Sequence, residues 1–283
     1  MPGKLVTLGD AAALVGDGDS VALGGFAITR CSIAFAHELV RAGRRELTVC
    51  QASGGLDTDL LAGGGCVRKI VSSGGSLDRF GTLYSANRGI LAGEIEFEEY
   101  SNLAVTFRFL AGALGLPYVA AKTMLGSDLL ANLGAESARL ERDPFTGEPV
   151  VVLPPLHPDV AVVHVDVADE DGNATVAGPT WNIRESAMAA RRTVLLAEEV
   201  VERGSLDPDA IVVQAPFVSS IVHVPFGAFP TAVLGRYDYD RPHLELYAAA
   251  ARAGGDAYAA YLDRFVHGAG THERFLELAG AAA

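Results

Sequence analysis

Short apolar segments with strand character alternate with helical segments through the first third of the chain, and this alternation constrains the fold more than any other feature. Strand signals span 21–25, 47–50 and 69–71, with a helix capped by Ser32 and a short helix over 57–61 between them. Parallel strands need long crossover connections, which helices usually supply. The pattern therefore predicts an α/β fold in three layers, with an open, largely parallel sheet and helices on both faces.

The second half of the chain continues the strand pattern. A long apolar strand covers 159–167 and turns through an Asp-Gly pair into 174–177, which is a hairpin signal. Further strand signals follow at 193–197, 211–213 and 221–224. His164 lies inside the long apolar strand, which favours a hydrogen-bonded core histidine over a catalytic base.

Three other segments complete the predicted organisation. A helix beginning near Glu98 has four large apolar residues on one face: Leu103, Phe107, Leu110 and Leu114. Residues 141–158 hold five prolines and are predicted to form a surface loop or flap. Residues 241–279 are predicted to be a helical tail. We expect a single domain over 1–283.

Composition excludes several classes of function. The chain has 22 basic and 35 acidic residues, a net charge of −13, which argues against binding to nucleic acid or to an anionic membrane. No apolar run approaches the roughly 20 residues that span a bilayer, and the N-terminus does not resemble a signal peptide, so we expect a cytoplasmic protein. Three cysteines and seven histidines show no metal-binding spacing, so we expect buried reduced thiols and no metal site.

Gly24 and Gly25 stand at the end of the first predicted strand, just before Phe26. Adjacent glycines leave the backbone amides accessible, and ligands of open α/β sheets bind outside the carboxyl ends of strands. The segment has neither G-x-G-x-x-G nor a Gly-Lys-Ser/Thr sequence, so it is neither a dinucleotide fingerprint nor a P-loop. A ligand-binding loop and a tight turn without a ligand both remain possible.

The same segment carries a family resemblance. Asp17-Gly18, an apolar stretch and Gly24-Gly25-Phe26 resemble the signature of A-type subunits of family I coenzyme A transferases. The general signature ends in Gly-x-Pro, whereas this chain has Arg30-Cys31-Ser32, and the glutaconate CoA-transferase A-subunit branch is similar in also carrying an arginine there. Other segments resemble that branch in the same order along the chain: 99–101, 113–117, 125–127, 158–164 and 219–240.

The resemblance implies one half of a two-subunit enzyme that moves CoA between an acyl-CoA and a carboxylic acid. In such enzymes a glutamate attacks the thioester, forms an anhydride and then becomes a glutamyl thioester. In two-subunit members this glutamate belongs to the B subunit, and no matching motif occurs here. We therefore expect no catalytic residue in this chain, a partner B subunit in a heterodimer or heterotetramer, and coenzyme A as a co-substrate without a bound cofactor.

We expect this chain to contribute substrate contacts instead. Most candidates follow predicted strands, whereas Arg30 lies beside a helix start and Asn102 lies in the helix that begins near Glu98. They are Gly24, Gly25, Phe26, Arg30, Ser72, Ser73, Gly74, Asn102, Gly126 and Ser127. Arg30 can pair with a substrate carboxylate or be a surface arginine beside a helix start. Ser72, Ser73 and Gly74 can offer donors to an oxygen of the substrate or form a solvated turn.

Two rival functions remain open. A ring-cleaving CoA-thioester hydrolase of the same fold resembles this chain too, but its branch places an acidic residue where this chain has Asn102, an amide that cannot act as a base. The second rival is a non-catalytic subunit that stabilises or regulates its partner. The acidic pairs are expected to be structural, with Glu98-Glu99 at a helix start and Glu198-Glu199 at a strand end.

Overall fold

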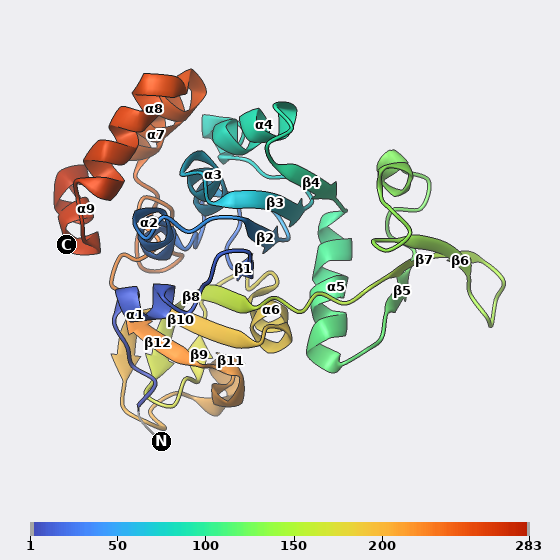
Figure 1. Ribbon diagram of the computed structural model, residues 1–283. Helices are drawn as coiled ribbons and strands as arrows, with labels where there is room; N and C mark the ends of the chain where they lie inside the picture. The colour runs from blue at the N-terminus through green and yellow to red at the C-terminus, as the bar shows by residue number, and fades with distance from the viewer. Residues whose placement is uncertain (1–2, 282–283) are drawn as a thin grey trace.

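The computed structural model describes residues 3–281, which are built around a nine-stranded sheet (Figure 1). Seven of its strands run parallel. In spatial order they are β12 (Ser220–His223), β10 (Arg192–Val201), β8 (Val160–Asp169), β1 (Ser20–Leu23), β2 (Leu47–Gln51), β3 (Val67–Ser72) and β4 (Glu96–Glu99). The short strands β9 (Ala174–Thr175) and β11 (Ile211–Val213) add an antiparallel extension beside the end of β8. The predicted parallel sheet is confirmed.

Successive side chains of each strand point to opposite faces of the sheet, so the strands contribute to two apolar cores. In β1, Val21 and Leu23 belong to one apolar cluster and Ala22 belongs to another. On the first face lie α1 (Leu8–Ala12), α2 (Ile33–Arg41), α3 (Leu56–Gly63) and α4 (Tyr84–Leu91). On the second face lie α5 (Asn102–Leu114) and α6 (Ile183–Ala189). The three-layer prediction is therefore confirmed.

The predicted helical tail forms a further layer outside the first face. It comprises α7 (Arg241–Ala253), α8 (Gly255–Leu262), a π-helical turn over Asp263–His267, and α9 (His272–Ala279). Figure 1 shows these helices outside α2 and α3. The fully buried ring of Phe275 lies edge-on to His37 of α2 and His243 of α7, with centroids 4.6 and 5.5 Å away. The tail thereby completes the core on this side.

Two buried aspartates of α3 tie this layer together. Asp57 accepts a hydrogen bond from the Ser32 amide at the start of α2, at 2.9 Å. Asp59 accepts the Ser85 and Ala86 amides at the start of α4, at 2.8 and 2.9 Å, and the Tyr247 hydroxyl from α7. Burial raises the pKa of both carboxyls to about 6, against the effect of these hydrogen bonds. Free amides at helix starts require such partners, which explains acids inside a core.

The segment predicted as a surface loop or flap over 141–158 contains the end of one strand and the whole of another, joined by a turn over 143–148. Strands β5 (Val119–Ala121), β6 (Arg139–Arg142) and β7 (Pro149–Leu153) form a three-stranded antiparallel sheet that projects past α5 in Figure 1. Pro149 is tolerated because it is the first residue of its strand. Val151 and Leu153 are buried against the second core, and this apolar alternation outweighs the proline signals. We call residues 119–153 the flap.

The helix predicted from Glu98 exists, but its start and its buried side differ from the prediction. Glu98 and Glu99 end strand β4, and the Ser101 side chain caps α5 by accepting the Ala104 amide. The residues that α5 buries are Ala104, Val105, Arg108, Phe109 and Ala111. The predicted apolar face of Leu103, Phe107, Leu110 and Leu114 lies on the other side, where Leu103 and Leu114 are exposed.

Candidate functional site at the carboxyl edge of the sheet

The loops that follow β1, β2, β3 and β4 lie side by side because the strands are parallel. Each loop is tied to its neighbour by a hydrogen bond that involves the backbone. These bonds run from the Gln51 side chain to the Gly24 carbonyl (3.1 Å), from the Gly54 amide to the Gly74 carbonyl (2.8 Å), and from the Tyr100 amide to the Ser72 carbonyl (2.9 Å). The structure thus brings the Gly24 loop, the Ser72 loop and the start of α5 to one edge, where open α/β sheets bind ligands.

The glycine loop is a tight turn whose geometry requires Gly25. The Phe26 and Thr29 backbones pair with each other across it, at 2.9 and 2.8 Å. Gly25 has φ +88°, and a Cβ added there would lie 2.4 Å from the Arg30 carbonyl oxygen. Ala27 and Arg30 also adopt left-handed backbone, with φ +52° and +54°. Such strain in residues with a Cβ concentrates at functional sites, but the turn alone accounts for Gly25.

The Phe26 side chain at this turn packs against Trp181. The two rings stack with centroids 5.6 Å apart and an interplanar angle of 15°. Both side chains are partly exposed, and Trp181 itself has left-handed backbone with φ +41°. Trp181 therefore shares the environment of the predicted site residue Phe26.

The sequence left two roles open for Arg30, and the structure excludes one of them, that of a surface arginine beside a helix start. Its side chain is almost fully buried and donates to Asp166 of β8 at 2.7 Å and to the Ala177 carbonyl at 2.8 Å. Asp166 also accepts the Ala177 amide and pairs with Arg236 at 3.3 Å. The carboxylate that Arg30 binds here therefore belongs to the chain itself, and the pair anchors the glycine loop to β8.

A second buried polar group lies beside this pair. Glu198 of β10 bonds His164 Nε2 at 2.7 Å, and accepts the Tyr237 hydroxyl at 2.5 Å and the Phe226 amide at 2.7 Å. Burial works to raise the pKa of Glu198, but the hydrogen bonds from His164 and Tyr237 outweigh it and lower that pKa. Glu198 and Glu199 lie within β10, which continues to Val201, and not at its end. His164 is the hydrogen-bonded core histidine that was predicted.

The hydroxyls of Ser72 and Ser73 are already used within the chain. Ser72 donates to the Gly74 carbonyl at 2.7 Å, and Ser73 donates to the Ala52 carbonyl at 2.6 Å. A hydroxyl has one hydrogen to donate, so neither serine offers its hydroxyl hydrogen to a substrate in this conformation. Ser72 itself is fully buried, whereas Ser73 and Gly74 in the turn that follows are partly exposed. Gly74, with φ +93°, faces open space.

The start of α5 meets the beginning of the flap. The Ser101 and Thr123 hydroxyls lie 2.6 Å apart, which brings the turn at Gly126 and Ser127 close to this end of the helix. The Ser127 hydroxyl closes that turn by donating to the Met124 carbonyl at 2.8 Å. Asn102 is the first residue of α5 and is exposed. Three predicted site residues, distant in sequence, therefore gather at one place.

Most of the carboxylates at this edge are committed to partners. Asp57, Asp166 and Glu198 each accept at least two hydrogen bonds from the chain. Glu98 accepts the Tyr100 hydroxyl at 2.7 Å and pairs with Lys69 at 3.0 Å. The half-buried side chain of Glu99, at the end of the edge strand β4, has no hydrogen bond or ion pair with any residue in 3–281. Sequence reasoning predicts that Glu98-Glu99 is a structural pair at a helix start, and so it does not find this carboxylate, unpartnered within 3–281, at the end of a strand.

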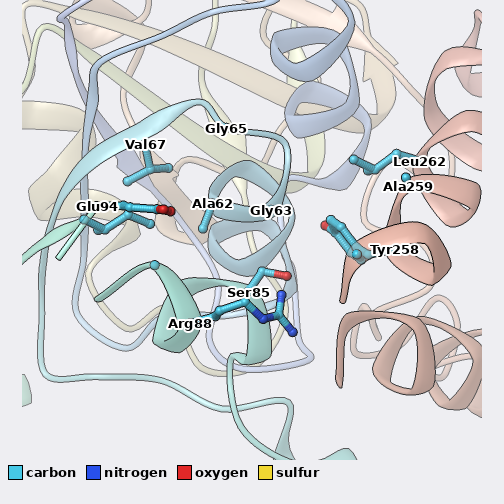
Figure 2. A pocket seen from close by; sticks show the side chains of 13 residues that line it. Ala62, Gly63, Gly65, Val67, Ser85, Arg88, Glu94, Tyr258, Ala259 and Leu262 are labelled. Atoms are coloured by element: carbon cyan, nitrogen blue, oxygen red, sulfur yellow. The ribbon is translucent and has the colours of Figure 1, made fainter. Parts of the chain in front are cut away.

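A hollow of about 480 Å³ lies away from this site, between α3, α4 and α8 (Figure 2). Gly65 and Val67 at the start of β3 belong to its lining, so it is at the amino edge of the sheet. Figure 2 shows the Ser85 hydroxyl facing Tyr258, with Arg88 below. Arg88 already donates to the Ala251 carbonyl at 2.5 Å. None of the predicted site residues lines this hollow.

Other structural facts bear on the predictions made from composition. Cys31, Cys50 and Cys66 are free and buried, as predicted, and burial raises the pKa of the Cys50 and Cys66 thiols to about 12 and about 11. Within residues 3–281 no three His, Cys, Asp or Glu side chains are grouped so that they could hold a metal ion. None of the helices described in that range is long and apolar enough to cross a membrane.

The fold and the site define a class of protein. Residues 5–224 match the Coenzyme A transferase family, and the chain belongs to that family. It is 31% identical to the A subunit of glutaconate CoA-transferase from Acidaminococcus fermentans, over 98% of this chain and 92% of the relative. A crystal structure of glutaconate coenzyme A-transferase from that organism superposes with a TM-score of 0.93 at 29% identity, covering 98% of this chain and 93% of the other.

Other relatives carry different names. The A subunit of 3-oxoadipate CoA-transferase from Pseudomonas knackmussii is 32% identical over 94% of both chains. The cholesterol ring-cleaving hydrolase IpdA subunit of Mycobacterium tuberculosis is 28% identical over 89% of both. The decarboxylase AibA/AibB superposes with a TM-score of 0.82 at 31% identity, over 92% of this chain and 96% of the other. An uncharacterized protein of Archaeoglobus fulgidus is 33% identical over 94% of this chain, which spans only 60% of its length.

Proposed function

We propose that this chain is the A subunit of a two-subunit CoA-transferase, which moves CoA from an acyl-CoA to a free carboxylic acid. The reaction would run through a glutamyl anhydride and a glutamyl thioester on a B subunit. The observation that carries the proposal is the state of the carboxylates at the candidate site. Asp57, Glu98, Asp166 and Glu198 are all held by hydrogen bonds within the chain, so they are poorly placed to attack a thioester.

In this proposal the chain forms one side of the active site, and the partner's glutamate reacts from the other side. The Gly24 loop, with Phe26 and Trp181 stacked beside it, and the Asn102 end of α5 would face the acyl-CoA and the acid. Arg30 would position the glycine loop through Asp166 without touching the substrate. Coenzyme A would be a co-substrate, and with 35 acidic against 22 basic residues this chain would leave most of the nucleotide contacts to the partner.

A hydrolase is the second candidate, and one observation favours it. A hydrolase needs a base to activate water, and Glu99 is a half-buried carboxylate at the candidate edge without a partner among residues 3–281. Against this, Asn102 stands at the position where the ring-cleaving hydrolases that this chain resembles have an acidic residue. The two transferase relatives are 31% and 32% identical to this chain, against 28% for the hydrolase relative. We therefore favour transfer over hydrolysis.

The test compares the chain alone with the chain co-expressed with the B-type CoA-transferase subunit of the same organism. Acyl-CoA donors are supplied with and without carboxylate acceptors, and both acyl transfer and release of free CoA are followed. We expect no turnover by the chain alone and acceptor-dependent transfer by the pair. Robust transfer by the isolated chain would refute the two-subunit proposal. A pair that assembles but neither transfers CoA nor hydrolyses the thioester would support a stabilising or regulatory role for this chain.

Glu99→Gln distinguishes the two reactions, because the amide keeps the size of the side chain but cannot act as a base. A transferase whose nucleophile is on the partner should keep its activity within about tenfold. A hydrolase that depends on Glu99 should lose about 10²–10⁴-fold in turnover, the usual contribution of a general base. Glu94→Gln, at an exposed carboxylate by the amino edge, is the matched control and should leave either activity unchanged.

A further inference from the structure

Helix α5 is apolar on both sides, but the chain buries only one side fully and leaves the other partly exposed. Its inner side packs Ala104, Val105 and Phe109 into the second core. The opposite side, which we call the outer α5 face, consists of Leu103, Phe107, Leu110 and Leu114. Leu103 and Leu114 are 50% and 58% exposed. A helix that is hydrophobic all round is normally buried on all sides, so the outer α5 face lacks a covering layer.

This face also lacks charge, in a chain whose net charge is −13. The one ionisable side chain of α5 is Arg108, which is buried and donates to the Pro154 carbonyl at 3.0 Å. Two more apolar side chains are exposed just after the helix, Leu116 at 41% and Tyr118 at 55%. Exposed apolar side chains gathered in one region mark interaction sites.

The outer α5 face begins at the candidate site. Asn102 and Leu103 form the first turn of α5, directly after Ser101, whose hydroxyl meets Thr123 of the flap. A partner that covers the helix from Leu103 to Leu114 would therefore also lie beside the carboxyl edge of the sheet. A partner docked on α4 or α7, on the first face of the sheet, would be separated from α5 by the sheet itself.

We propose that the outer α5 face is the docking surface for the subunit that carries the nucleophilic glutamate, an inference that rests on the proposed function. The glutamate must reach bonding distance of a thioester held at the carboxyl edge, so the partner's contact surface must adjoin that edge. A second copy of this chain would bring no such nucleophile. The charge-free surface also allows the partner to approach an otherwise acidic chain without repulsion.

The first experiment measures assembly with the B-type CoA-transferase subunit of the same organism. Leu103→Asp combined with Leu114→Asp places two charges on the surface, and we expect affinity for the B-type subunit to fall at least 100-fold by sedimentation or biolayer interferometry. Leu91→Asp combined with Leu246→Asp is the matched control on exposed leucines of α4 and α7, and should change affinity less than threefold. Unchanged affinity of the first double variant would overturn the proposal.

A labelling experiment avoids any doubt about the folding of charged variants. The native cysteines are buried, so a maleimide should react mainly with an introduced thiol in Leu114→Cys. We expect at least tenfold slower labelling of Leu114→Cys once the B-type subunit is added, and unchanged labelling of Leu91→Cys. Protection of Leu114→Cys by the chain itself at high concentration would instead assign the face to a second copy, and equal labelling in all cases would refute docking there.

The outcomes separate this inference from the proposed function. If the B-type subunit protects the Leu114→Cys variant but the wild-type complex transfers no CoA, the docking surface stands and the transferase is refuted. If the wild-type complex transfers CoA but the Leu114→Cys variant stays fully reactive in its complex, the transferase stands and the docking surface is refuted. A wild-type chain that never associates with the B-type subunit would refute both.

Discussion

The two faces of the main sheet carry helices that differ in what lies outside them. On the first face, α2, α3 and α4 are covered by the tail helices α7, α8 and α9, and buried rings such as Phe275 fill the space between the layers. On the second face, α5 has a packed inner side, but its outer side is left open. Both layers bury apolar residues against the same sheet.

The difference shows which side of the chain buries its apolar helices without help from another subunit. The closed side satisfies its helix starts with the buried acids Asp57 and Asp59 and supplies its own covering layer. The open side presents leucines next to the candidate site. Substitutions on the closed side should therefore act on the stability of the isolated chain, whereas those on the outer α5 face should act on assembly.

The largest effect is expected at Phe275, in the centre of the closed side. Phe275→Ala removes a fully buried ring that contacts several aromatic neighbours, and should lower the free energy of unfolding by about 3–5 kcal/mol. Phe145→Ala, at a flap residue that is 94% exposed, should change it by less than about 0.5 kcal/mol. Denaturant unfolding of the isolated chain measures both, and equal losses would show that the tail is not part of the core.

Asp59 should have the next largest effect. Asp59→Ala leaves two amides of α4 unpaired and removes the acceptor of the Tyr247 hydroxyl, and should cost about 2–4 kcal/mol. Asp59→Asn keeps an oxygen for the amides and should cost less. Because burial raises the pKa of Asp59 to about 6, above its unfolded value, the carboxyl contributes less stability as the pH rises from about 4 to 6. Asp59→Asn should flatten that dependence in urea titrations, and an unchanged slope would contradict this cause.

A smaller effect should appear on the packed side of α5. A Cβ added at Gly112 would lie 2.1 Å from the Leu156 carbonyl oxygen, so Gly112→Ala should destabilise the chain by about 1–3 kcal/mol despite the better helix propensity of alanine. Gly9→Ala in α1 meets nothing within 4 Å and should stabilise by up to about 1 kcal/mol. Melting temperatures that move in the same direction for both variants would contradict the close packing of α5.

The smallest effect concerns pH at the tail. Burial lowers the pKa of His37, His243 and His272, that of His243 to about 4. A histidine whose pKa is lowered by folding stays neutral in the folded chain while the unfolded chain takes up a proton. Its contribution to stability is therefore complete above the unfolded pKa near 6.5 and is lost as the pH falls below that pKa. The loss is at most about 1.4 kcal/mol per histidine and pH unit. Hydrogen exchange of α7 to α9 should therefore quicken, relative to the intrinsic rate, from pH 7 to pH 6.

The matched variants for this effect are His243→Gln and His267→Gln. Glutamine at 243 can still bond the Tyr261 hydroxyl, which lies 2.9 Å from the histidine ring, but it does not titrate, so it should reduce the pH dependence of exchange. His267 is exposed, and its replacement should leave that dependence unchanged. If the pH dependence of exchange is unchanged in His243→Gln, it must arise from His37 and His272 instead.

Periodicity and strand signals predicted the main sheet except for β4, whose acidic residues suggest a helix start. The valine-rich run over 160–167 favours a buried strand, and adjacent strand–helix units imply parallel pairing. The same reasoning placed the Gly24 and Ser72 loops at one edge, since parallel strands end together. Asn102 joins that edge only in the structure, where β4 ends just before α5. The prolines of 141–158 predicted a surface loop or flap, but the strands within it were not predicted, because their pairing and the burial of Val151 and Leu153 depend on tertiary contacts.

Only the tertiary structure decided how the side chains are used. Arg30 has the chemistry to bind a substrate carboxylate, but the fold places Asp166, 136 positions away in sequence, within 2.7 Å of it. Leu103 and Leu114 have the spacing of a core stripe, yet the sheet contacts the opposite side of α5. A helical pattern shows which residues share a face, but it cannot show which face meets the sheet when both are apolar, because that depends on contacts between residues far apart in the chain.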